Sequence, residues 1–84
     1  MTFTVVWTRP AENELAAVWM AAADRAAVTA AAARMDAELA RDGDQAGESR
    51  DPGVRVLLVE PLGVLFTVPA GARTVYVFRA WGYR

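Results

Sequence analysis

Apolar and polar residues alternate over the first eight positions of the chain, which is the pattern of a half-buried β-strand. Phe3, Val5 and Trp7 fall on one side, and the residues between them, mostly threonine, fall on the other. The β-branched content of the segment also suits a strand. We therefore predict a first strand over residues 2–8 whose Phe3, Val5 and Trp7 face the core.

The apolar spacing then changes to that of a helix. Pro10 lacks an N–H group and is therefore well placed in a first helical turn. Leu15, Val18, Trp19 and Ala22 follow at intervals of three and four residues, which put them on one helical face. The segment predicts an amphipathic helix with these four residues turned inward.

A second helix is predicted directly after the first. Asp24 is a suitable N-cap residue, and Asp42 and Gly43 provide a stop. The apolar positions between them repeat at helical spacing: Val28, Ala31, Ala32, Met35 and Leu39. Because the connection between the helices is short, we expect an antiparallel αα-hairpin.

The remaining sequence predicts a loop followed by three strands. Residues 42–53, DGDQAGESRDPG, are rich in turn formers and have no periodicity, so we expect one long loop. The stretches VRVLLVE, VLFTV and TVYVFRAW follow, joined by PLG and PAGAR, and they are typical of an antiparallel meander with tight turns.

The expected fold class is α+β, with the order β-α-α-β-β-β in a single domain over residues 1–84. The helical hairpin should pack on one face of a mostly antiparallel sheet, because each layer has one apolar side to bury. The other sheet face should remain open. On it we expect some combination of Arg55, Arg73, Arg79 and Tyr83.

Composition narrows the possible chemistry. The chain has no cysteine and no histidine, which leaves no disulfide and no preferred transition-metal ligand, so we expect no cofactor and no metal. All nine cations are arginine, and guanidinium groups clamp phosphate but seldom move protons. The net charge of −1 disfavours general nucleic-acid binding, although residues 54–84 carry four arginines against one glutamate. No leader or membrane-spanning segment is visible, which favours a cytoplasmic protein.

The sequence resembles toxins of the RelE/ParE superfamily, the toxin half of type II toxin–antitoxin modules. The resemblance covers nearly the whole chain and is carried by the opening strand into WTRPAENELAAVW, by ADRAAVTAAAARMDAELARD, by the loop, and by RVLLVEPLGVLFTV and RTVYVFRAW. It implies a compact toxin that binds a cognate antitoxin through its sheet and helices, in a toxin–antitoxin hetero-oligomer.

The resemblance leaves the target open. RelE-like and YoeB-like members cleave ribosome-bound mRNA, which would make this chain an endoribonuclease. ParE-like members inhibit DNA gyrase without catalysis. A third possibility is a degenerate member that binds its antitoxin without being toxic. Our first expectation is ribosome-dependent mRNA cleavage, with gyrase inhibition as the alternative.

For a ribonuclease, the resemblance also implies roles for individual residues. The reaction needs a base for the 2′-hydroxyl, cations around the phosphorane and an acid for the leaving oxygen. By position, Glu48 matches the loop carboxylate of YoeB-like members and Tyr83 matches their terminal tyrosine. Gly82 stands where those members have a histidine, and Gly63 lies near the place of their strand arginine. Two of the expected groups are therefore missing.

A site without lysine or histidine would have to use arginine. In this hypothesis Glu48 is the base, Arg50 and Arg55 clamp the phosphate, and Arg79 is the transition-state cation. Tyr83 is an acid or a stacking ring. Further candidates for substrate or phosphate binding are Arg73, Arg84 and Trp81. The competing interpretation is a solvated charge cluster, in which exposed pairs contribute about 0–1 kcal/mol each.

Overall fold

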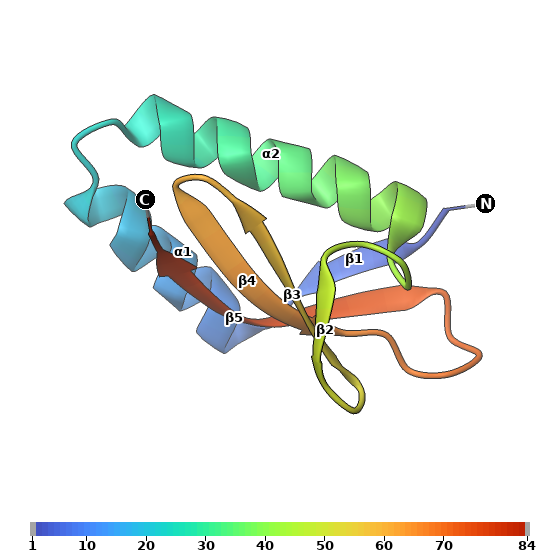
Figure 1. Cartoon of the computed structure of the whole chain (residues 1–84). Helices are drawn as coiled ribbons and strands as arrows, with labels where there is room; N and C mark the ends of the chain where they lie inside the picture. The colour runs from blue at the N-terminus through green and yellow to red at the C-terminus, as the bar shows by residue number, and fades with distance from the viewer. Residues whose placement is uncertain (1, 84) are drawn as a thin grey trace.

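The computed structural model describes residues 2–83, and within them two helices follow a first strand and precede four more (Figure 1). The elements are β1 (Thr4–Trp7), α1 (Arg9–Ala21), α2 (Arg25–Asp42), β2 (Glu48–Asp51), β3 (Val54–Val59), β4 (Leu62–Thr67) and β5 (Thr74–Gly82). Neither helix in this range combines the length and the apolar character needed to cross a membrane.

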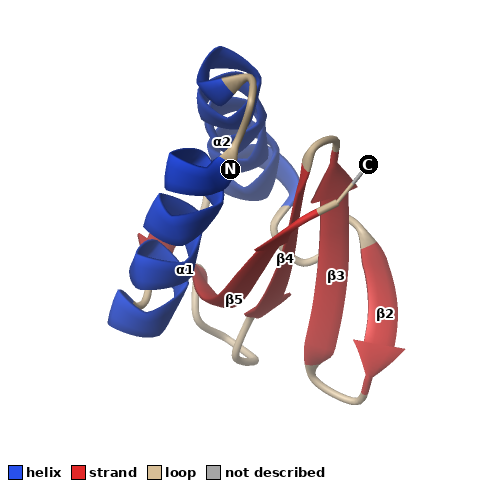
Figure 2. Ribbon diagram, turned by 90° about the vertical axis from the view of Figure 1, so that its left-hand side faces the viewer, coloured by secondary structure: helices blue, strands red, loops and turns tan. Residues whose placement is uncertain are grey.

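The strands form one mixed sheet in the order β1-β5-β4-β3-β2. The first strand, β1, runs parallel to the last, β5, and the other neighbours are antiparallel. Both helices lie on the same side of the sheet, as Figure 2 shows. The predicted α+β architecture, a helical hairpin on one face of a mostly antiparallel sheet, is therefore confirmed.

Both helices begin at the capping residues that their sequences provide. Thr8 caps α1 by accepting the N–H of Ala11 at 3.4 Å, and Asp24 caps α2 by accepting the N–H of Ala27 at 3.0 Å. These bonds satisfy backbone donors that have no partner inside a helix. The predicted N-cap at Asp24 is confirmed.

The end of α1 is fixed by the first residue of α2. Arg25 donates to the carbonyl oxygens of Trp19 at 3.1 Å and Met20 at 3.0 Å. Its guanidinium carbon lies 4.7 Å from the centroid of the Trp19 ring. A cation that binds carbonyls at a helix C-terminus also interacts favourably with the helix dipole. Arg25 therefore holds the sharp turn between the two helices.

The core lies between the helices and one face of the sheet. The register sets this face, because Leu57 and Val59 of β3 pair with Val64 and Leu62 of β4. Both helices and all strands except β2 contribute side chains to it. The fully or largely buried apolar residues of this core include Phe3, Ala11, Ala31, Met35, Leu39, Leu57, Val59, Leu62, Val64, Phe66, Val75, Val77 and Ala80.

Two details of the predicted chain path are wrong. Part of the expected long loop, residues 42–53, forms the short strand β2, which pairs with β3 through a turn at Pro52 and Gly53. Gly53 has a φ of 79°, which glycine adopts without strain and which a type II turn requires. The meander turn also falls at Glu60 and the cis Pro61 instead of at PLG, so the following residues belong to β4.

Candidate functional site

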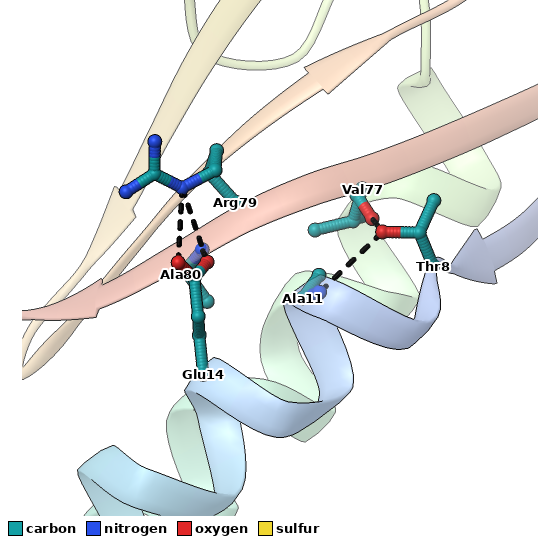
Figure 3. A network of polar contacts seen from close by, with 6 residues as sticks. All are labelled: Thr8, Ala11, Glu14, Val77, Arg79 and Ala80. Atoms are coloured by element: carbon teal, nitrogen blue, oxygen red, sulfur yellow. Dashed lines mark hydrogen bonds and ion pairs between the residues drawn. The ribbon is translucent and has the colours of Figure 1, made fainter.

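Helix α1 is joined to strand β5 by two polar side chains (Figure 3). The Thr8 hydroxyl donates to the carbonyl oxygen of Val77 at 3.0 Å. Six residues further along, Glu14 accepts the backbone N–H of Ala80 at 2.8 Å. Because β1 ends at Trp7, opposite Val77, the rest of β5 has no strand neighbour on that side. Glu14 therefore satisfies a donor at an otherwise open sheet edge.

Arg79 is held by the same carboxylate. Its Nε donates to the two oxygens of Glu14 at 3.2 and 3.0 Å. The hydrogen bond from the Ala80 N–H lowers the pKa of Glu14 below its usual value; burial opposes this shift, and the charge and hydrogen bond of Arg79 reinforce it. The Arg79 side chain remains 58 % exposed, and among the described residues its two terminal nitrogens make no hydrogen bond.

The predicted site residues do not include Glu14. A signal was present, because Glu14 lies three residues after Ala11 and four before Val18, both of which pack on the inner side of α1. A carboxylate on the inner stripe of a helix needs a donor from the neighbouring layer. The identity of that donor depends on where β1 ends.

The sheet face opposite the helices is mainly apolar. Val6 of β1, Leu58 of β3 and Tyr76 of β5 are 36 %, 51 % and 38 % exposed. We call this surface the open face. By strand register its apolar members also include Leu65 and Trp81, which are half-buried, and Val56, which is only 7 % exposed.

Arg79 is the only one of the four residues expected on the open face that the strand register places there. Arg55 lies on the other side of the sheet, which corrects the prediction. It lies two residues before Leu57 and four before Val59, so the three side chains share a face of β3, and those of Leu57 and Val59 point into the core. Arg55 donates to the carbonyl oxygens of residues 45, 46 and 47 at 3.3, 2.8 and 3.2 Å. Its donors therefore hold the segment between α2 and β2.

The other two residues expected on the open face, Arg73 and Tyr83, lie outside the strands. Arg73 precedes β5, and its guanidinium carbon lies 4.3 Å from the centroid of the Phe3 ring. Tyr83 follows β5 and donates its backbone N–H to the carbonyl of Pro61 at 2.8 Å. Both positions are explained by local packing at the ends of β5. The remaining candidate, Arg84, lies outside the described residues.

Glu48 and Arg50 are exposed on β2, the edge strand of the sheet. Glu48 belongs to a row of laterally paired residues that crosses four strands: Glu48 with Val56, Val56 with Leu65, and Leu65 with Arg79. Three strand spacings separate the ends of the row, or about 14 Å between Cα atoms. Glu48 and Arg79 therefore share a face without being in contact.

The glycine near the expected place of a strand arginine lies under an aromatic ring. Gly63 pairs with Trp81 across β4 and β5, and a Cβ added to Gly63 would lie 2.7–2.8 Å from the indole ring. The absence of a side chain at Gly63 therefore allows the indole to cross the strand. Trp81 is half-buried and contributes an aromatic group to the open face, at the position where the ribonuclease hypothesis calls for a cation.

The predicted catalytic residues are spread over the molecule. Acid–base cleavage of a phosphodiester requires groups within about 2.6–3.2 Å of the reacting atoms. Arg55 is on the helix side of the sheet, Arg79 is three strands away from Glu48, and Tyr83 lies about four residues beyond Arg79. Residues 2–83 also contain no group of three carboxylates placed to share a metal ion. This arrangement presents an apolar surface with separated charges.

Two solved structures share this arrangement of elements. One is titled the chromosomal ParDE TA system from P. aeruginosa: the TM-score is 0.74 at 22 % identity, with 99 % of this chain and 98 % of that chain covered. The chain has the RelE/ParE fold. The other, the RelBE2 toxin–antitoxin complex from Mycobacterium tuberculosis, gives a TM-score of 0.78 at 18 % identity, with 98 % of this chain and 92 % of that chain covered.

No protein-family model and no curated protein sequence matches the chain. The RelE/ParE fold is therefore recognised through its three-dimensional arrangement, at sequence identities of 22 % and 18 %. At such low identities, structural similarity shows the fold but does not identify the molecule on which the chain acts.

Proposed function

We propose that this chain is the toxin of a type II toxin–antitoxin module and that a cognate antitoxin holds it inactive in a hetero-oligomer. The observation that carries the proposal is the RelE/ParE fold, which extends over nearly the whole of two chains from toxin–antitoxin systems. Exposed apolar surface supports a protein partner. Besides the open face, a wholly apolar groove runs between the helices, lined by Leu15, Ala16, Trp19, Val28, Thr29 and Ala32.

For the toxic activity, we propose binding to a protein target, with DNA gyrase as that target, in place of RNA cleavage. The dispersal of the predicted catalytic residues supports this choice, and the Arg55 guanidinium is already used by backbone carbonyls. Trp81 over Gly63 supports it as well, since an indole is suited to a protein interface and provides no charge to stabilise a phosphorane.

Ribosome-dependent mRNA cleavage is the second candidate. The observation in its favour is that Glu48 and Arg50 are both exposed on β2, free of the contacts that engage Arg55 and Arg79. A carboxylate and a guanidinium on one edge strand could meet an RNA backbone that lies along it. In that case both side chains would be needed for toxicity.

Induced expression of the chain in bacteria separates these activities. Gyrase inhibition predicts that thymidine incorporation falls before methionine incorporation and that the purified chain inhibits supercoiling by gyrase. mRNA cleavage predicts that methionine incorporation falls first and that Glu48→Ala or Arg50→Ala abolishes the effect. Arg34→Ala, an exposed arginine of α2, is the matched control for the loss of one surface cation.

The toxin proposal itself has a separate test. A short antitoxin-like protein should be encoded beside this chain, and its co-expression should restore growth and yield a complex that co-purifies. Absence of any growth defect, with co-purification retained, would identify a degenerate member that binds its antitoxin without toxicity. Absence of both would contradict the proposal.

A further inference from the structure

The row from Glu48 to Arg79 has opposite charges at its two ends and apolar residues at its centre. Val56 and Leu65 are the central pair, on the neighbouring strands β3 and β4. The row lies across the open face, which none of the described helices covers (Figure 2). A surface with this charge order is complementary to itself when it is turned by half a rotation.

We propose that the isolated chain forms a two-fold symmetric homodimer through its open face. The rotation axis runs parallel to the strands and passes between β3 and β4. This operation places β2 of one copy over β5 of the other, so that Glu48 faces the partner copy's Arg79 twice. A rotation axis perpendicular to the strands would instead place Glu48 over the partner copy's Glu48 and Arg79 over the partner copy's Arg79, and like charges repel. The charges therefore select one orientation.

The chemistry of Arg79 fits this arrangement. Glu14 engages only its Nε, so the two terminal nitrogens remain to meet a second carboxylate. Figure 3 shows these nitrogens pointing away from Glu14. Stacked sheets lie about 10 Å apart, a gap that a glutamate and an arginine side chain span together. Each Arg79 then pairs with Glu14 of its own copy and Glu48 of the other.

The apolar residues of the open face also complement one another under the same operation. At the centre, Val56 of one copy lies opposite Leu65 of the other; Val56 is already largely covered in the single chain, so Leu65 offers more of the exposed area there. Leu58, half exposed in the single chain, lies over the partner copy's Gly63, where the Trp81 indole crosses β4. A protruding leucine thus faces an aromatic surface. Burial of exposed leucine, tyrosine and indole surface would drive the association, and the charges would fix its orientation.

Sedimentation of the purified full chain, from low-micromolar to several hundred micromolar, tests the proposal. The wild-type chain should show a monomer–dimer equilibrium. Glu48→Arg and Arg79→Glu should each weaken dimerisation at least about tenfold, since each variant places like charges opposite one another twice. Glu60→Arg makes the same charge change at an exposed turn and should alter the dissociation constant less than about twofold.

Mixing the two variants gives the decisive measurement. The mixture restores both opposite-charge pairs, so E48R and R79E should form a heterodimer at concentrations where each alone dimerises far more weakly. Circular dichroism verifies that both variants are folded. A third variant, Leu58→Asp, changes an exposed residue away from the Glu14–Arg79 pair and should also dissociate the dimer. A wild-type chain that stays monomeric throughout, a mixture that fails to associate, or a dimer unaffected by L58D would overturn the proposal.

Discussion

The two faces of the sheet are built from alternate residues of the same strands, but they meet different surroundings. On the face covered by the helices, a polar side chain must satisfy its donors within the protein, as Arg55 does with three backbone carbonyls. On the open face, Leu58 and Tyr76 remain exposed although no layer requires them to be apolar. The first face thus stabilises the fold, and the second is the surface that we propose for binding a partner.

The largest difference between the faces should appear in their contribution to stability. Phe66 is fully buried on the covered face, so Phe66→Ala should lower the free energy of unfolding by about 3–5 kcal/mol. Leu65, its neighbour on the open face, is only half-buried, and Leu65→Ala should cost less than half as much. Urea denaturation of both variants measures the difference. Equal losses would show that the open face is already packed in the isolated chain.

Arg55 should behave as a structural residue. Removing its three hydrogen bonds in Arg55→Ala should lower the free energy of unfolding by about 1–2 kcal/mol, mainly because the bond to the Ala46 carbonyl is partly buried, whereas the bonds to residues 45 and 47 are exposed. Arg50→Ala, at an exposed position, should change it by less than about 0.5 kcal/mol. Denaturation curves give both values. An Arg55→Ala variant with wild-type stability would contradict the structural role and leave the Arg55 guanidinium available to bind phosphate.

The contact between Gly63 and Trp81 should depend on both residues. Gly63→Ala places a Cβ against the indole and should cost about 1–3 kcal/mol of folding free energy. In a Trp81→Ala background the same substitution should be neutral or stabilising, because alanine is otherwise favoured over glycine in a strand. The double-mutant cycle is measured by urea denaturation. Additive effects would mean that the indole does not cross β4 in solution.

The smallest effect is expected at Glu14, where α1 meets the edge of β5. Its pKa is lower in the folded chain than in the unfolded chain, so the ionised carboxylate stabilises the fold above the unfolded-state pKa. This contribution disappears as the pH falls through the folded-state pKa. Glu14→Gln should therefore be less stable than the wild-type chain near neutral pH, and the difference should shrink on acidification below the usual glutamate range.

Thermal unfolding at several pH values tests this trend. Glu12→Gln removes one negative charge from the same helix at an exposed position, away from β5. The difference between E14Q and E12Q at each pH therefore isolates the contact with Ala80 and Arg79. A difference that grows on acidification would reverse the sign of the linkage and contradict the hydrogen bond from Ala80.

Burial explains which parts of the fold could be predicted. The strand β1 and both helices show apolar residues at the period of their own geometry, so the alternation and spacing located them. Strand β2 is exposed along its whole length and has no such period. Its pairing depends on the Pro52–Gly53 turn, a signal that is visible in the sequence but easily assigned to a loop.

The candidate site was harder to predict for a related reason. Alternation correctly groups Arg55 with Leu57 and Val59, but it does not say which of the two groups the helices cover. Likewise, Glu48 and Arg79 lie on one face, and only the register reveals the three strand spacings between them. Glu14 acquires its role from the point at which β1 ends. These relations join distant parts of the chain and are not encoded in a local pattern.

The parallel pairing of β1 with β5 has a consequence for the order of events during folding. Within residues 2–83, β1 pairs only with β5, and two helices and three strands lie between them in the chain. Until β5 has docked, β1 has no neighbour in the sheet and Glu14 has no Ala80 N–H to accept. A chain in which β5 is detached therefore also loses the strand that joins β1 to β4. The complete sheet, and any activity that depends on it, requires this contact between distant parts of the chain.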